Sequence, residues 1–174
     1  MHAQARLAVR VDVAARSEIA AEHLLGCCYR VETAMAAFYW FLAELHKGTP
    51  EITALWRKTA GEEENHARQF EFALKFPNLI ADLVVKAEDV DRLLAEVLGL
   101  GAAVRATKPL AVDALRKCID LEQRLADYHM NSIGIIHDSQ MQKVFEAMMA
   151  ADREHVQTLV EALDRLAPPS RREG

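Results

Sequence analysis

The chain has 174 residues, enough for one domain with a sizeable core. Hydrophobic residues make up 51% and charged residues 27%, a globular composition that excludes a disordered chain. The net charge of −5, without any run of lysine or arginine, argues against nucleic acid as a partner. There is no apolar run of membrane-spanning length and no signal-peptide pattern, so we expect a cytoplasmic protein with no membrane partner.

Glycine and proline separate the expected helices. The first helix, 18–47, ends before a glycine, and the second, 50–75, follows at once. Thr49 is the expected N-cap of the second helix, and Pro50 stands at its first helical position. Residues 1–17 are interpreted as an N-terminal extension.

The connection 78–108 is long and mostly helical in its apolar pattern. A third helix is expected over 109–133 and a fourth over 139–167. Ser139 and Gln142 are spaced as a capping box at the start of this last helix.

Residues 18–167 are therefore expected to form one all-α domain, followed by a tail at 168–174. Short turns join the first two helices and the last two, so each pair should be antiparallel. A four-helix bundle with one long, partly helical crossover between its second and third helices has the connectivity of ferritin-like folds.

Each expected helix has an apolar stripe, with residues at steps of three and four, and a carboxylate in the middle of that stripe. On the second and fourth helices a histidine follows the carboxylate by three residues. These polar stripe residues are Glu32, Glu63, His66, Glu122, Asp152 and His155. No lysine or arginine lies on the stripes. Buried carboxylates repel one another unless positive charge lies between them, so we expect metal ions, and iron, manganese or zinc suits these donors.

The two halves of the chain repeat this arrangement. Glu32 precedes Glu63 by 31 residues, and Glu122 precedes Asp152 by 30. Two similar helical hairpins would provide two nearly equivalent metal positions, as in carboxylate-bridged di-metal bundles. We therefore expect two metal ions per chain, with Glu63 and Asp152 as bridging ligands and Glu32 and Glu122 as terminal ones.

A simpler interpretation remains open. A Glu-x-x-His pair alone usually lies on a solvated face, and Glu62, Glu63 and Glu64 form a charge run of the kind that is normally exposed. The agreement of four helices in position and spacing favours metal binding. The alternative is a bundle whose polar residues hydrogen-bond to one another.

Two segments resemble the rubrerythrin branch of the ferritin-like superfamily. WRKTAGEEENHARQF (Trp56 to Phe70) is similar to that family's second helix, with an acidic run before His-Ala. LRKCIDLEQRLADYH (Leu115 to His129) is similar to its third, in which a tyrosine follows a glutamate by six residues. The resemblance covers about residues 20–166. It implies oxygen- or peroxide-reactive iron held by the six stripe residues, and a homodimer or larger homo-oligomer.

The chain departs from the family in three respects. It has no rubredoxin-like module with two C-x-x-C pairs, and Leu125 stands where the family places a second glutamate in the third helix. Asp152 replaces a glutamate in the last motif. The expected centre is therefore closer to a plain six-ligand ferritin-like site than to the centre of a rubrerythrin-type peroxidase.

The expected function is that of a di-iron oxidoreductase that reacts ferrous iron with peroxide or dioxygen, by peroxide reduction or ferroxidase chemistry. Its electron donor is not identifiable from the sequence. The alternatives are a non-catalytic metal-binding or iron-storage subunit and a metal-free ferritin-like interaction protein.

Four further residues lie near the expected centre. Tyr39, seven residues after Glu32, is interpreted as a hydrogen-bond donor near the metals or as an ordinary core tyrosine. Cys28 and Cys118 each precede a stripe glutamate by four residues and are expected to be small buried core residues. His129 is either an extra ligand or proton carrier or, more simply, a core or interface histidine.

Overall fold

The computed structural model describes residues 2–76, 87–132 and 138–167, and within them the side chains of residues 21–76, 88–127 and 138–167. All regular secondary structure in these described residues is α-helical, as expected. The helices are α1 (His2–Leu45), α2 (Pro50–Ala73), α3 (Ala87–Thr107), α4 (Ala111–Ser132) and α5 (Ser139–Leu166). In this part of the chain, none of the helices is both long and apolar enough to span a membrane.

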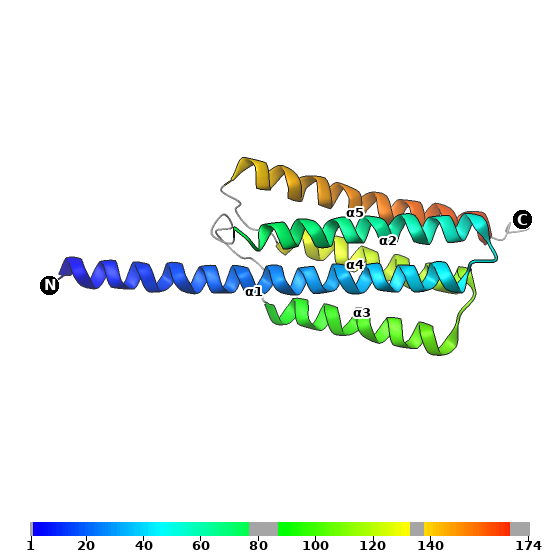
Figure 1. Cartoon of the computed structure of the whole chain (residues 1–174), viewed down its shortest axis with the longest axis horizontal. Coiled ribbons are helices and arrows are strands. Elements are labelled where there is room, and N and C mark those ends of the chain that lie inside the picture. The colour runs from blue at the N-terminus through cyan, green and yellow to red at the C-terminus, as the bar shows by residue number, and fades with distance from the viewer. Residues whose placement is uncertain (1, 77–86, 133–137, 168–174) are drawn as a thin grey trace, which may run out of the picture.

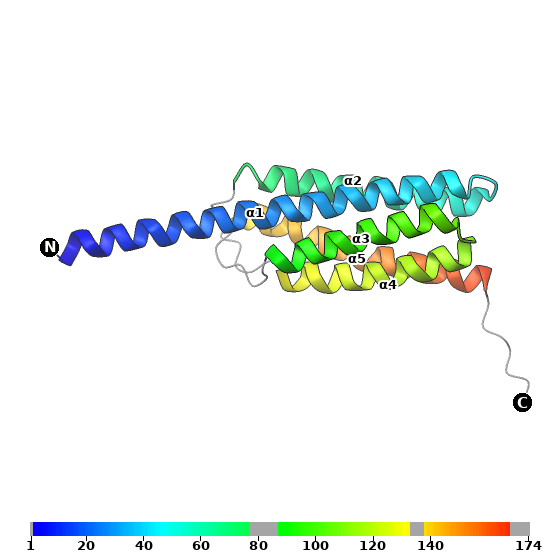
Figure 2. The same cartoon turned by 90° about the horizontal axis from the view of Figure 1, so that it is seen from below.

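The helices lie side by side with their axes close to parallel, as both views show (Figures 1 and 2). α1 packs extensively on α2, and α4 packs on α5. The members of each pair run in opposite directions (Figure 1). α3 lies along α1 on the side away from α5 (Figure 1). The predicted helices 50–75, 109–133 and 139–167 agree with the observed ends within about two residues.

α1 is longer than expected, because it begins at His2 instead of near residue 18. Its first part extends beyond the ends of the other helices (Figures 1 and 2). The residues assigned to an N-terminal extension therefore continue the same helix. The sequence explains this locally, since HAQARLAVRVDVAARS is rich in alanine and arginine and contains neither glycine nor proline.

The expected helical crossover contains α3, while residues 78–86 of it lie outside the described residues. The apolar residues of α3 recur at helical spacing, and its buried members face the core. They are Val90, Leu93, Leu94, Val97 and Val104. Because α3 packs chiefly on α1, it adds a layer to one side of the molecule without separating α1 from α2.

Of the two helix N-caps predicted from the sequence, the structure confirms the one at α2 and contradicts the one at α5. Thr49 is the N-cap of α2 and Pro50 follows it, although the Thr49 side chain makes no capping hydrogen bond. The prediction that Ser139 and Gln142 form a capping box at the start of α5 is wrong. Asp138 caps α5 instead, because its Oδ1 accepts hydrogen bonds from the backbone N–H groups of Gln140 and Met141, at 3.0 and 2.8 Å.

The predicted stripes form the core that surrounds the polar residues. On α1 they bury Met35, Tyr39 and Leu42, each with no exposed surface. Phe70 on α2 and Phe145 on α5 meet with their ring centroids 5.6 Å apart. This apolar packing on both sides of the stripe carboxylates excludes bulk solvent from them.

Candidate metal centre

The six polar stripe residues are all buried and come from four helices. Their exposed fractions are 1–4%: Glu32 on α1, Glu63 and His66 on α2, Glu122 on α4, and Asp152 and His155 on α5. The buried residues that the structure describes include no lysine or arginine. Four carboxylates and two imidazoles therefore share one interior region without a permanently positive side chain among them.

His66 lies where three helices meet. Its Nδ1 atom is 3.2 Å from Oε2 of Glu63 on the same helix. The same nitrogen lies 3.7 Å from Oε2 of Glu32 and 3.5 Å from Oδ1 of Asp152. One imidazole nitrogen thus faces three carboxylates, an arrangement that suits a shared cation.

Glu63 lies between the two histidines. Its Oε2 faces His66, and its Oε1 is 3.3 Å from Nδ1 of His155. The two imidazole rings are 5.4 Å apart between centroids and nearly stacked. Glu63, His66 and His155 present ligand atoms that all lie within 4.8 Å of one another. A carboxylate that offers one oxygen to each of two imidazoles has the placement expected of a bridging ligand.

Glu122 on α4 is held by Tyr39 on α1. The Tyr39 hydroxyl donates a hydrogen bond of 2.5 Å to Oε1 of Glu122. Burial, followed by the negative charge of Glu63, raises the pKa of Glu122 well above its ordinary value. Burial and the charge of Glu122 likewise raise the pKa of Tyr39. Tyr39 is thus a fully buried core residue whose hydroxyl donates to a candidate ligand, and its role near a metal stays a prediction.

The electrostatics of the two histidines follow from the surrounding carboxylates. Burial by itself lowers the pKa of His66, but hydrogen bonds to Glu32 and Glu63 and their charges outweigh it and raise the pKa to about 11. Burial also lowers the pKa of His155, but the hydrogen bond to Glu63 and the charge of Glu63 outweigh it and raise the pKa to about 9. These raised pKa values favour protonated imidazoles in the metal-free protein, whose positive charge would offset part of the carboxylate charge.

Several buried atoms of the centre lie close to an oppositely charged group but lack a well-aligned hydrogen bond within the described part of the chain. They include Oε1 of Glu63 and both ring nitrogens of His155, which face Glu63 and Glu62 at 3.3 and 3.0 Å. Buried polar atoms are normally satisfied, since leaving one without a partner costs about 1–3 kcal/mol. Carboxylate oxygens and imidazole nitrogens are donors for iron, manganese and zinc, so the residues present fit a metal ion.

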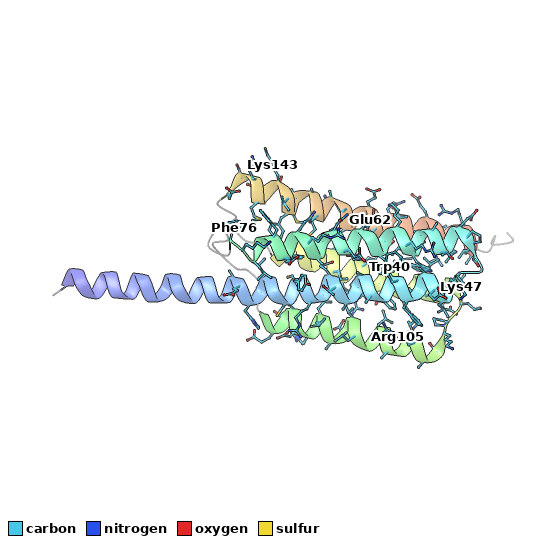
Figure 3. The ribbon with its side chains drawn as sticks, viewed as in Figure 1. Trp40, Lys47, Glu62, Phe76, Arg105 and Lys143 are labelled. Carbon is cyan, nitrogen blue, oxygen red and sulfur yellow. The ribbon has the colours of Figure 1, made fainter. Side chains whose placement is uncertain are left out.

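Glu62 is a candidate that the sequence interpretation missed. Its Oε2 lies 3.0 Å from Nε2 of His155, and its side chain is 30% exposed. Glu62 lies on α2 on the side toward α5 (Figure 3), and Lys58 forms an ion pair with it at 3.2 Å. In metal sites, a carboxylate beside the outer nitrogen of a histidine fixes the ring orientation. A charge run such as Glu62 to Glu64 is normally exposed, and no spacing in the sequence distinguishes Glu62 within it.

The cysteines near the centre are inert core residues, as expected. Cys28 and Cys118 are buried free thiols. Burial and the charges of Glu32 and Glu122, respectively, raise their pKa values, which keeps both thiols protonated. The side chain of His129 lies outside the described residues, so its role stays a prediction.

No known protein family, curated protein or solved structure matches this chain. The functional argument therefore depends on the geometry of the centre.

Proposed function

We propose that α1, α2, α4 and α5 form a ferritin-like four-helix bundle that holds two metal ions, most simply iron, and that the protein is a di-iron oxidoreductase. One observation carries the proposal: six buried metal-type ligands from four helices converge without a buried lysine or arginine among the described residues. α3 is then the helical part of the crossover. The rubrerythrin-like segments agree with this proposal.

In this proposal each ligand has a distinct task. Glu63 presents one oxygen toward His66 and the other toward His155, so it would bridge two positions. Asp152, whose Oδ1 faces His66, is the second bridging candidate. Glu32 and Glu122 would each serve one position. Both imidazoles must give up their protons to bind, so metal binding would release protons.

The surrounding residues hold the centre and keep it dry. Tyr39 fixes one oxygen of Glu122 and remains protonated, because its pKa is raised. Trp56, fully buried, stacks on Tyr39 with ring centroids 5.7 Å apart and limits its motion. A ferrous pair in this setting would supply two electrons for the reduction of peroxide or dioxygen. An external donor, not identified by the structure, would restore them.

The first experiment counts metal. Wild-type protein, purified without chelator or metal-binding tag and then loaded anaerobically with ferrous iron, is expected to hold about two metal ions per chain in the core. A Glu63→Ala/His66→Ala double variant should lose them. A Glu64→Ala/Arg68→Ala double variant is the matched control, because it removes exposed polar contacts of the same helix, an ion pair and the hydrogen bonds to Trp40 and Asn65, and none of the six candidate ligands.

Turnover is then tested separately. The ferrous protein is mixed with hydrogen peroxide or dioxygen, and oxidant consumption is followed with and without a chemical reductant. Consumption that continues for many equivalents supports an oxidoreductase. Consumption that stops after one stoichiometric oxidation indicates a storage or binding subunit. Wild-type protein that holds no iron in the core would contradict the whole proposal and leave a metal-free scaffold.

A further inference from the structure

A second group of metal-type donors lies between α1 and α3, and the six-ligand centre does not include it. His23 and Cys27 are one helical turn apart on α1, and Asp91 lies in the first turns of α3. Cys27 is buried, whereas His23 and Asp91 are exposed. The group therefore lies at the molecular surface, and its cysteine is the buried member.

The distances between the donor atoms match those around a tetrahedral ion. Sγ of Cys27 lies 3.8 Å from Nε2 of His23 and 3.5 Å from Oδ1 of Asp91. With metal–sulfur bonds of about 2.3 Å and metal–nitrogen or metal–oxygen bonds of about 2.1 Å, a tetrahedral angle separates such donors by about 3.6 Å. All three donor atoms lie within 4.8 Å of one another. One ion can thus contact all three with only small side-chain movements.

Hydrogen bonding is a weaker explanation of the same arrangement. A thiol is a poor donor and a poor acceptor, so it gains little from a histidine and a carboxylate at these distances. Arg30 approaches Asp91 at 3.8 Å, but both side chains are about half exposed, at 59% and 48%. An ion pair of this kind contributes little stability, so Arg30 does not keep Asp91 from a metal.

The site is also open to solvent. A cavity of about 450 Å3 adjoins it, lined by Glu22, His23, Gly26, Cys27, Arg30 and Leu74. An ion can reach the thiol through this cavity, and water can occupy a coordination position that the protein leaves open.

We propose that His23, Cys27 and Asp91 form a second metal site that binds one borderline divalent cation of the zinc type and joins α3 to α1. One thiolate, one imidazole and one carboxylate are typical zinc donors, and three protein ligands with an open position are common in zinc sites. Because α3 packs chiefly on α1, this link fixes the start of α3 against its main packing partner among the described helices. The inference does not depend on the iron centre, which contains no sulfur ligand.

Cobalt tests the site in the full-length protein. One equivalent of Co2+ bound here is expected to give a thiolate-to-cobalt charge-transfer band in the near ultraviolet. Cys27→Ala should lose the band and bind one fewer zinc ion per chain. Cys28→Ala is the matched control, because it removes the neighbouring buried thiol. This variant should keep the charge-transfer band and bind as much zinc as the wild-type protein. Cobalt that binds in the core gives no such band, since the donors there are oxygen and nitrogen, so the band reports on the Cys27 site alone.

A second pair of variants avoids any change to the core. Asp91→Asn should weaken zinc binding at least about tenfold. Glu88→Gln, an exposed substitution in the same part of α3, should not change it. The proposal is overturned if wild-type protein shows no thiolate band, if the band persists in Cys27→Ala, or if zinc affinity is unchanged in Asp91→Asn.

Discussion

The hydroxyl of Tyr39 makes a buried hydrogen bond to Glu122, and the whole tyrosine side chain is enclosed. A Tyr39→Phe variant keeps the ring and its stacking on Trp56 but leaves the Glu122 oxygen without its donor. We expect the metal-free protein to lose about 1–3 kcal/mol of unfolding free energy, measured by urea denaturation, because a buried acceptor would be left unsatisfied. Tyr29→Phe is the control, since Tyr29 is 36% exposed. Equal stability of the two variants would show that the hydrogen bond contributes nothing.

Glu62 provides a second prediction at the scale of a residue. It lies 3.0 Å from the outer nitrogen of His155, whose other nitrogen faces Glu63. Substitution by glutamine keeps the shape and removes the charge that holds the imidazole in place. Metal affinity of the core should fall about 10–100-fold, measured by competition with a chromophoric chelator. Glu64→Gln, two residues further along α2, should leave the affinity unchanged, and a similar loss in both variants would argue against a specific role for Glu62.

At the scale of an element, Asp138 and Ser139 are the two candidates for the N-cap of α5, and single substitutions distinguish them. Asp138 accepts two backbone hydrogen bonds, whereas Ser139 is already the first helical residue. Asp138→Ala should therefore lower the unfolding free energy by about 1 kcal/mol. Ser139→Ala should change it by much less. Chemical denaturation of both variants gives the comparison, and a larger loss in Ser139→Ala would restore the capping box that the sequence suggested.

The sequence predicted the stripes well because helical periodicity fixes which residues share a face. Glu63 and His66 are three residues apart, so they must lie on the same side of α2 wherever that helix packs. The same argument applies to Asp152 and His155 on α5. Their burial follows from the apolar residues on either side, which is why the sequence alone identifies all six candidate ligands.

Other features depend on how whole helices are oriented, and periodicity does not determine that. Glu62 reaches His155 only because α2 and α5 are rotated to face each other at this point. The pattern of 78–108 predicted helix, but it contained no information that α3 packs on α1. For the same reason the sequence does not reveal the group of His23, Cys27 and Asp91, because its members come from two helices far apart in the chain.

At the scale of the whole molecule, the buried charges couple stability to pH. The pKa of His66 is raised to about 11 and that of His155 to about 9, both from an ordinary value of 6.5. Between pH 6.5 and these values, the folded metal-free protein binds protons that the unfolded chain releases. Stability is therefore fully present below pH 6.5 and is lost as pH rises. The raised pKa of Glu122 acts in the same direction, because its folded form also favours the proton.

Metal binding should reverse this dependence. An ion between the carboxylates replaces the imidazole protons, so proton competition decreases as pH rises and binding tightens. We expect the melting temperature of chelator-treated protein to fall from pH 6.5 to 9, while that of metal-loaded protein stays level or rises. Thermal unfolding of both forms in matched buffers measures the difference, and proton release on metal addition to unbuffered protein provides an independent check. A metal-free protein whose melting temperature rises over this range would mean that the histidines are neutral in the fold. The carboxylates would then lack the protons that, without metal, allow them to be buried together.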